Sequence, residues 1–403
     1  MNPLLEGRPG LARVLDALDH DGEEARIVGG AVRDWLTGRG VRSDVDIATT
    51  ALPEEVTRRA VAAGLKPVPT GIEHGTVTVI AEGEPYEVTT LREDVETDGR
   101  RARVVFGRSW AHDAGRRDFT MNALYLTRAG ELVDLVDGAA DAKAGRVRFI
   151  GDPDVRIRED YLRILRLFRF HAAYGQGPLD AAALAAAVRN RDGLGRLSRE
   201  RVRAEMMKLI VAPRAAETLA QMDAAGLLAP VLGRPGDVAT FSRLTEVETA
   251  LGMAPDAVRR LGALAVRGEE DADALREGLR LSNAEAERLA ALAGPAPAPA
   301  MCEKGQKAFL YRMGREAFQD RALIAFARSG AALDDAGWRD LAILAAGWPL
   351  PVFPLKAADF IARGRTPGPA LGAALKRAEE AWIDAGFPME PGALQAIIGE
   401  AMG

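Results

Sequence analysis

The sequence predicts an α+β protein, with a small mixed sheet in the N-terminal part and helices in the rest. Alternating apolar residues at 76–80 and 86–90, on either side of a turn at 82–85, predict a β-hairpin. Apolar residues then recur at helical spacing almost without interruption from Arg156 to the end. A chain of 403 residues is too long for one ordinary core, so we expect several domains.

The first elements follow from periodicity and from capping residues. Leu11, Val14, Leu15 and Leu18 have the i, i+3, i+4, i+7 spacing of one helical face. Pro53 suits the first turn of a helix, and Gly64 suits its end. In chain order we expect a helix within 1–21, a strand at 26–28, a helix at 31–36, a strand at 44–50, a helix at 54–63 and then the hairpin.

Beyond the hairpin the pattern is less regular. Residues 92–108 are crowded with charged residues and Gly and show no periodicity, so we expect a mobile loop there. A helix at 113–124 and a last short strand at 131–136 should follow. Clusters of Gly and Pro at 175–178, 233–236 and 294–299 should separate the later helices, and the alternating Pro and Ala of 295–299 form a candidate stiff linker.

Composition places the chain among ordinary globular proteins. It contains 48% hydrophobic and 28% charged residues, and a single cysteine excludes an intramolecular disulfide framework. The sequence shows neither a signal-like N-terminal segment nor an apolar run of the roughly 18–20 residues that span a bilayer. We therefore expect a soluble, cytoplasmic protein that does not contact membranes.

The charge is unevenly distributed along the chain. The net charge is −5, but residues 100–208 contain 22 Lys and Arg against 14 Asp and Glu, and the remainder contains 31 against 44. A basic middle within an acidic chain fits a local site for an RNA backbone or for triphosphates. Solvated helix faces would produce the same distribution, so this signal needs support from motifs.

Two short motifs near the N-terminus suggest phosphate and metal chemistry. Gly29 and Gly30 lack a Cβ, so their backbone can approach a phosphate closely, and the helix expected after them offers an anion site. Asp44 and Asp46 alternate with Val45 and would share one face of a strand, where two carboxylates can hold divalent cations. Alone, a Gly pair is usually a turn and an Asp-x-Asp a solvated face; together they predict nucleotidyl transfer.

These residues resemble the signature motif of the nucleotidyltransferase superfamily, and specifically its class II branch of CCA-adding tRNA nucleotidyltransferases and bacterial poly(A) polymerases. Further stretches resemble the other motifs of this branch, in the family order. They are a ribose-recognition motif at 116–124, a hinge motif at 134–138 with Asp141 and Gly145, a base-recognition helix at 159–170, and a last motif at 197–201 with Glu205 and Lys208. We recognise no sharp motif beyond Ala212.

The resemblance implies a domain order and an activity. A nucleotidyltransferase palm (head) domain at 1–140 would precede a neck with the base-recognition helix at 141–210, an RNA-binding helical body at 211–294 and a tRNA-binding helical tail at 295–403. The implied reaction is template-independent addition of C, C and A to the 3′ end of tRNA, from CTP and ATP with two Mg²⁺ ions and release of pyrophosphate. We expect a monomer or a weak homodimer.

Other functions remain open. A bacterial poly(A) polymerase would share the same catalytic half, and a partial enzyme would add only A or only CC. The long segment 92–108 argues against a CC-only enzyme, because the CC-adding relatives shorten it; we expect it to act between the C and A steps. A catalytically idle RNA-binding protein is a further alternative, and the intact Asp44 and Asp46 argue against it.

The resemblance also assigns roles to individual residues. Asp44 and Asp46 are the expected metal ligands, with Glu87 as a third catalytic carboxylate, although an exposed strand carboxylate explains Glu87 equally well. Asp118 and Asn122 lie four residues apart, would share a helical face and would bind the ribose. The residues expected to bind the triphosphate are Gly29, Gly30, Arg33 and Arg117.

In the family, an Asp and an Arg of the base-recognition motif act as a protein template that accepts C and A. Asp160 and Arg163 match them here, and Glu159 would orient Arg163. A carboxylate can accept from the exocyclic amine that C and A share, and an Arg can donate to a ring nitrogen or carbonyl. Arg166 and Arg169 would face phosphates. The plainer alternative is a helix face covered by ordinary ion pairs.

Overall fold

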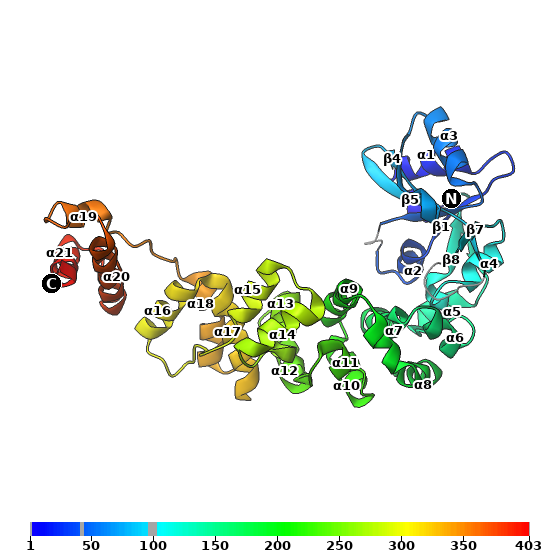
Figure 1. Ribbon diagram of the computed structural model, residues 1–403. Helices are drawn as coiled ribbons and strands as arrows, with labels where there is room; N and C mark the ends of the chain where they lie inside the picture. Colours follow the sequence, from blue (N-terminus) through cyan, green and yellow to red (C-terminus); the bar gives the residue numbers. More distant parts are fainter. Residues whose placement is uncertain (1, 41–43, 96–102, 403) are drawn as a thin grey trace. The chain divides into compact units, whose positions relative to one another are not determined.

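The computed structural model describes residues 2–40, 44–95 and 103–402 (Figure 1). Contacts divide the chain into two compact units, Met1–Val231 and Leu232–Gly403. The first unit contains a seven-stranded mixed sheet, and the second is built from helices, so the predicted α+β class is confirmed. No helix within the described ranges is long and apolar enough to cross a lipid bilayer.

The sheet has the strand order β3-β4-β5-β2-β1-β8-β9. Its central strands β2 and β5 run parallel, whereas β1 pairs antiparallel with both β2 and β8. The predicted hairpin is present as β4 and β5. The strands are β1 (Ala25–Val28), β2 (Asp46–Thr49), β3 (Lys66–Gly71), β4 (Thr76–Ala81), β5 (Glu84–Thr90), β8 (Leu124–Thr127) and β9 (Leu132–Asp134).

Helices of the first unit pack on the sheet and continue beyond it. Helices α1 and α3 contact each other and β4, while α2 contacts β1 and β8 (Figure 1). Helix α7 packs against both α9 and α10. These helices are α1 (Pro9–Leu18), α2 (Gly30–Leu36), α3 (Pro53–Ala62), α4 (Trp110–Gly115), α5 (Gly138–Ala144), α6 (Pro153–Glu159), α7 (Leu162–Tyr174), α8 (Ala181–Arg189), α9 (Arg199–Ile210), α10 (Ala215–Ala224) and α11 (Leu228–Leu232), with 3-10 turns at Pro3–Leu5, Ile72–His74, Thr120–Asn122 and Arg191–Arg196.

The second unit contains two apolar clusters that hold its last helices. One surrounds Trp382 and Phe360, and the other surrounds Phe318 and Leu341. The predicted boundaries of neck, body and tail are not tested by these clusters and stay predictions. The helices are α12 (Val238–Ala250), α13 (Ala257–Ala265), α14 (Glu269–Leu279), α15 (Asn283–Ala290), α16 (Glu303–Met313), α17 (Arg315–Ser329), α18 (Ala336–Gly347), α19 (Ala357–Ile361), α20 (Pro369–Asp384) and α21 (Pro391–Met402).

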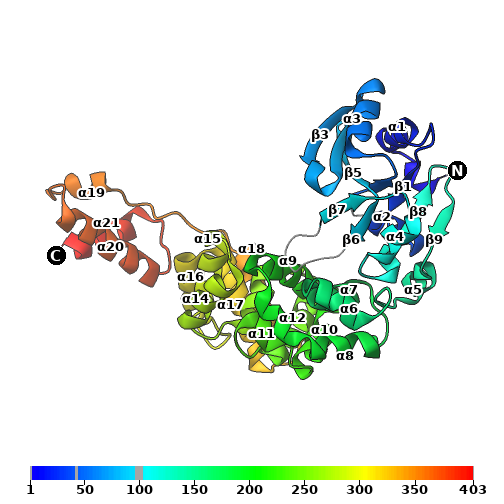
Figure 2. The ribbon, with the colours of Figure 1, turned by 45° about the vertical axis from the view of Figure 1, so that its right-hand side comes forward.

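The expectation of a mobile loop at 92–108 is wrong for residues 92–95 and 103–106, which form strands, whereas residues 107–108 have no regular secondary structure, as expected. Strands β6 (Arg92–Val95) and β7 (Arg103–Phe106) form an antiparallel pair, visible side by side in Figure 2. Residues 96–102, where the loop was also expected, lie outside the described residues. Backbone pairing of the two ends therefore supplies order that the charged, aperiodic sequence does not indicate.

The helix expected at 113–124 is also wrong beyond Gly115. Helix α4 ends there, and the chain continues through a turn into a 3-10 turn and then β8. Phe119 instead forms an isolated bridge with Phe149 and is fully buried. Tertiary packing therefore overrides the local helical pattern. Asp118 and Asn122 accordingly do not share a helical face.

Two further expectations need correction near the site. Asp44 precedes β2 rather than lying in it, although the alternation of exposed Asp44, buried Val45 and exposed Asp46 is as predicted. The base-recognition segment is two helices, because Asp160 has extended backbone angles and separates α6 from α7. Its carboxylate accepts a hydrogen bond from the backbone N–H of Leu162, the local bonding by which Asp favours helix starts over helix interiors. Asp160 and Arg163 are therefore not neighbours on one helix.

Candidate functional site

One cavity of about 550 Å³ in the first unit gathers most of the predicted site residues. Asp44, Glu87 and Glu159 are the predicted residues that do not line it. The cavity is polar and mostly basic, as expected for a site that receives a triphosphate. Its lining residues are Gly29, Gly30, Arg33, Asp46, Arg116, Arg117, Asp118, Asn122, Asp160, Leu162, Arg163, Arg166, Arg169, Phe170, Tyr174 and Arg201.

The acidic part of the site is set by the register of the sheet. Ile47 pairs with Val88 in the parallel strands β2 and β5, so Asp46 and Glu87, each one residue earlier, are neighbours. Burial and the negative charges of Glu87 and Asp44 raise the pKa of Asp46 to about 6, against the opposing effect of Arg117. The structure shows no hydrogen bond or ion pair from these three carboxylates to any described residue. This concentrated negative charge is what a divalent cation would relieve.

We expect Asp46→Asn to raise the midpoint of thermal unfolding at pH 7.5 in the presence of a chelator. The folded pKa of about 6 exceeds the ordinary value of 3.8, so the ionised carboxylate costs stability above about pH 6, and this cost vanishes as the pH falls below about 4. Although the surroundings of the carboxylate exclude enough water to raise its pKa, Asp46 as a whole residue is exposed and its charge is screened, so the gain should be small, roughly 1–3 °C.

Differential scanning calorimetry at pH 7.5 and pH 4 measures this effect. Glu82→Gln is a suitable control, because Glu82 pairs with Arg13 on an exposed surface and should give no rise. A lower midpoint for Asp46→Asn at pH 7.5, or equal shifts at both pH values, would contradict the repulsion among the three carboxylates.

The phosphate end of the cavity begins beside Asp46. Val28 of β1 pairs with Asp46, and Gly29 follows Val28. The φ of Gly29 is 74°, a backbone conformation that residues other than Gly rarely adopt. Arg33, one turn into α2, is 4% exposed. Its guanidinium donates to Asp34 and to Asn122 and lies 3.7 Å over the ring of Tyr174. These contacts fix Arg33 in the cavity wall in a single orientation.

Asp118 and Asn122 come together although they lie outside any α-helix. The amide of Asn122 donates to Asp118 Oδ1 over 3.1 Å, and the guanidinium of Arg166 donates to Asp118 Oδ2 over 2.7 Å. Burial favours the neutral acid, but Arg166 and Asn122 outweigh it and hold the pKa of Asp118 below its ordinary value. Asp118 is therefore an ionised hydrogen-bond acceptor at neutral pH.

The side chain of Arg163 is tied to neighbouring segments. Arg163 Nη1 donates to Glu159 Oε2 over 2.5 Å and to the backbone oxygen of Arg156 over 2.8 Å. Arg156 in turn donates to Glu159 and to the backbone oxygen of Arg117. Glu159 therefore lies behind Arg163 and holds it, which is the arrangement that an orienting residue requires.

The remaining predicted residues contact partners from α9. Asp160 Oδ2 accepts from Arg201 Nη2 over 2.6 Å, and Arg169 Nε donates to Glu205 Oε2 over 2.5 Å. Arg169 also lies 4.2 Å over the ring of Phe170. Arg166 and Arg169 are thus paired with carboxylates at the cavity wall, and phosphate contact by either stays a prediction.

Five cavity residues were not named as site residues from the sequence: Arg116, Leu162, Phe170, Tyr174 and Arg201. Four of them stand inside quoted motifs: Arg116 beside Arg117, Leu162 and Phe170 in the stretch 159–170, and Arg201 at the end of the last motif. Phe170 and Tyr174 follow Arg166 at four-residue steps, so they share its face of α7. Helical spacing from a known site residue was therefore a usable signal for the aromatic pair.

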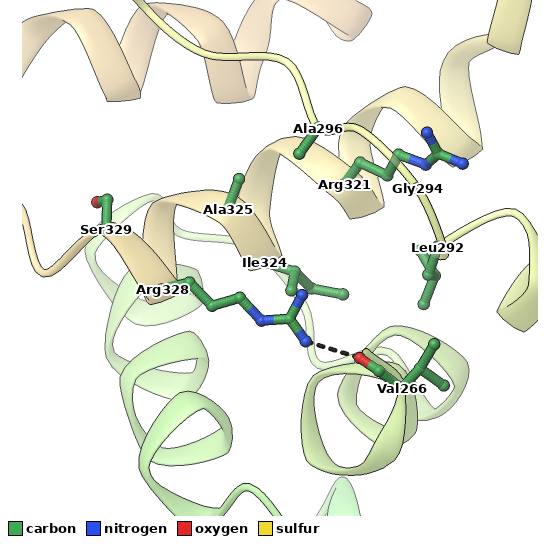
Figure 3. A pocket seen from close by; sticks show the side chains of 9 residues that line it. All are labelled: Val266, Leu292, Gly294, Ala296, Arg321, Ile324, Ala325, Arg328 and Ser329. Carbon is green, nitrogen blue, oxygen red and sulfur yellow. Dashed lines mark hydrogen bonds between the residues drawn. The ribbon is translucent and has the colours of Figure 1, made fainter. Parts of the chain in front are cut away.

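A different cavity, of about 270 Å³, lies in the second unit (Figure 3). Two arginines of α17 line it, and both donate to backbone carbonyls: Arg328 to Val266, at the end of α13, and Arg321 to Ala291, at the end of α15. A cation at the C-terminal end of a helix stabilises that end. These arginines therefore have a structural role, and this cavity is not the candidate active site.

The carboxylates of Asp44, Asp46 and Glu87 form an acidic patch beside the glycine turn at Gly29 and Gly30. Together with the oriented arginines of the cavity, this patch has the features of a nucleotidyltransferase site. Comparisons with known proteins agree with this class. Residues 25–148 match the poly A polymerase head domain, and residues 178–236 match the family described as the probable RNA and SrmB-binding site of polymerase A.

Individual relatives and a solved structure show which members of this family the chain resembles. The mitochondrial CCA tRNA nucleotidyltransferase 1 of Mus musculus is 34% identical over 402 residues, which are 96% of this chain and 89% of that protein. The CCA-adding enzyme of Leuconostoc citreum is 45% identical over 210 residues, 51% of this chain and 50% of that protein. The crystal structure of Bacillus stearothermophilus CCA-adding enzyme in complex with CTP has a TM-score of 0.75 at 29% identity, covering 99% of this chain and 98% of that chain.

The chain therefore belongs to the family of CCA-adding tRNA nucleotidyltransferases and bacterial poly(A) polymerases. The resemblance carried by the sequence motifs is confirmed, and so is the assignment as a nucleotidyltransferase.

Proposed function

We propose that the protein adds C, C and A to the 3′ end of tRNA, using CTP and ATP and no nucleic-acid template. One observation carries this proposal: a single cavity joins Asp46, the phosphate-side residues Gly29 and Arg33, and the candidate base-recognition residues Asp160 and Arg163. The names of the relatives at 34% and 45% identity support the same reaction.

The donor set fits Mg²⁺, and we propose that Asp44 and Asp46 hold it, with Glu87 as an adjacent third carboxylate. Within the described ranges no three His, Cys, Asp or Glu side chains are already grouped as metal ligands. Mg²⁺ is usually bound by one or two carboxylates together with water and substrate phosphates, so Asp44 and Asp46 would be sufficient as the protein ligands. Two bound ions would activate the attacking oxygen and neutralise charge on the leaving oxygen.

Residues of this chain would position the reactants. Arg33 and Arg117 would hold the triphosphate, and Asp118 and Asn122 the ribose hydroxyls. The 3′ hydroxyl of the RNA would give its proton to solvent, and its oxygen would form a bond to the α-phosphorus. The bond between the α-phosphorus and the α–β bridging oxygen would break, and pyrophosphate would leave with that electron pair. Alignment of these groups supplies most of the catalysis, because the protein forms no covalent bond.

Base choice would depend on Arg163, in the first turn of α7, and on Asp160, in the link between α6 and α7. The guanidinium of Arg163 is fixed by Glu159, and the carboxylate of Asp160 is fixed by Arg201. Fixed donors and acceptors discriminate between base edges better than mobile ones, because the wrong base leaves them unpaired. The separate anchoring of the two side chains is thus compatible with a protein template.

A bacterial poly(A) polymerase is the second candidate, since the head-domain family matched by residues 25–148 bears that name. A partial A-adding or CC-adding enzyme also shares this catalytic half. The proposed neck, RNA-binding body and tRNA-binding tail, the cytoplasmic location and the monomeric or weakly dimeric state are likewise proposals.

The test uses purified protein, tRNA that lacks its 3′ CCA, and each labelled nucleotide singly and in pairs. CTP alone should extend the tRNA by two residues, and CTP with ATP should complete CCA and stop. Continued growth with ATP alone would instead identify a poly(A) polymerase. Addition of only A or only CC would identify a partial enzyme, and no incorporation at all would overturn nucleotidyl transfer to tRNA.

A further inference from the structure

Asp113 of α4 is a buried carboxylate, 1% exposed, at the back of the candidate active site. Its Oδ1 accepts from the guanidinium of Arg116. Its Oδ2 accepts from Nε and Nη2 of Arg117, over 3.1 and 2.9 Å, and from the hydroxyl of Tyr125 over 2.8 Å. One carboxylate thus binds both arginines of the Arg116-Arg117-Asp118 stretch and ties them to strand β8.

This bonding fixes the direction of Arg117. Asp113 accepts from Nε and Nη2 of Arg117, whereas Nη1 makes no hydrogen bond to any residue that the structure describes, and Arg117 lines the cavity. A Cβ placed on Gly29 would lie 3.9 Å from that Nη1, so the free edge is beside the glycine turn. The charge of Arg117 also lowers the pKa of Asp46, so the guanidinium is close enough to act on that carboxylate.

Burial and the two guanidiniums act in opposite directions on Asp113. Burial favours the neutral acid, but Arg117 and Arg116 prevail and hold the pKa of Asp113 below its ordinary value. The carboxylate is therefore ionised at neutral pH. Without that charge, the carboxylates of Asp46 and Glu87 would be competing partners for Arg117.

We propose that Asp113 is a positioning residue for nucleotide binding: it aims the Nη1 edge of Arg117 at the triphosphate and keeps Arg117 off the acidic patch. This inference rests on the proposed function. Asp113 does not line the cavity, so it acts through Arg117 and does not touch the substrate.

The test measures CTP and ATP binding to the full chain by isothermal titration calorimetry, together with steady-state kinetics. Asp113→Asn should weaken binding of both nucleotides roughly 10- to 100-fold, the range for losing a hydrogen bond to a charged group, and should raise KM more than it lowers kcat. If Asp113→Asn does not fold, Tyr125→Phe removes one bond to the same carboxylate and should weaken binding in the same direction.

A double-mutant cycle separates positioning from general destabilisation. Adding Asp113→Asn to Arg117→Ala should weaken nucleotide binding little further, because the residue through which it acts is already gone. Asp320→Asn is the matched control, since Asp320 is also 1% exposed and binds two arginines, Arg288 and Arg259, in the second unit. It should reduce stability but leave nucleotide affinity unchanged.

Additive effects of Asp113→Asn and Arg117→Ala, or a loss of affinity no larger than that of Asp320→Asn, would overturn the positioning role. Failure of the unaltered protein to bind either nucleotide would instead overturn the proposed function. The two failures are therefore distinguishable.

Discussion

Asp46→Asn is expected to reduce nucleotide incorporation by about 10²–10³-fold or more, the loss that follows removal of one charge-stabilising group from a transition state. Asp46 lines the cavity beside Gly29, and it is the carboxylate whose pKa is raised by both Glu87 and Asp44. Replacing it by Asn keeps the size of the side chain but removes the charge that a divalent cation needs. Primer extension with labelled CTP at saturating Mg²⁺ measures the effect.

The loss should be one of chemistry and not of folding or RNA binding. The variant should retain its circular dichroism spectrum and its affinity for tRNA in a filter-binding assay. Glu84→Gln, on the same strand as Glu87, should retain activity, because Glu84 contacts the hydroxyl of Tyr86 outside the cavity. Activity of Asp46→Asn within about tenfold of the unaltered enzyme would refute its role as a metal ligand.

Arg163→Ala is expected to damage the choice of base more than the binding of nucleotides. Arg33 and Arg117 would still hold the triphosphate, whereas the donor to the base edge would be lost. Each lost bidentate contact should cost on the order of 1–3 kcal/mol of discrimination, so UTP and GTP should be incorporated at rates that approach the rate for CTP. Competition assays with pairs of labelled nucleotides measure the ratios of kcat/KM.

Arg169→Ala is the matched control on the same helix. Its partner is Glu205, and a contact with phosphate would carry no base information, so KM should rise alike for all nucleotides. Equal weakening of all four nucleotides by Arg163→Ala, with the preference for C and A intact, would mean that the Glu159–Arg163 contact is an ordinary ion pair.

The sequence predicted those elements in which the spacing of apolar residues matches the face that is buried in the folded protein. The β4–β5 hairpin has alternating apolar residues around a Gly turn, and the sheet buries that same face. Strand β3 was missed, since Pro67 and Pro69 obscure a strand pattern. The β6–β7 pair was missed because neither the charged β6 nor the short β7 shows alternation, and the two strands are held by pairing with each other and by contact of β6 with α4.

The site was predicted in residue identity better than in geometry. Gly29, Arg33, Asp46 and Arg163 do line one cavity, because their motifs specify residue types that the chemistry needs. Spacing alone suggested that Asp160 belongs to the helix of Arg163, but the backbone breaks there. An Asp followed two residues later by the start of an apolar helical run is a capping signal that could have predicted this break.

Side chains of α6 and α7 donate hydrogen bonds to main-chain carbonyls of residues 116–117, and these bonds determine which segment would have to be exchanged to transfer base specificity between enzymes. Arg156 holds the carbonyl of Arg117, and the side chain of Arg163 lies against the carbonyl of Arg116. The segment that would read the base is thus fastened to the main chain of the segment that would hold the phosphates. A chimera that exchanges α6 and α7 alone would combine the base-recognition side chains of one enzyme with the residue 116–117 main chain of another, so these hydrogen bonds would not be preserved as a set. Exchange of 110–205 as one block keeps these attachments together with the contacts that Asp160 and Arg169 make to α9, so we expect base specificity to be transferred with that stretch.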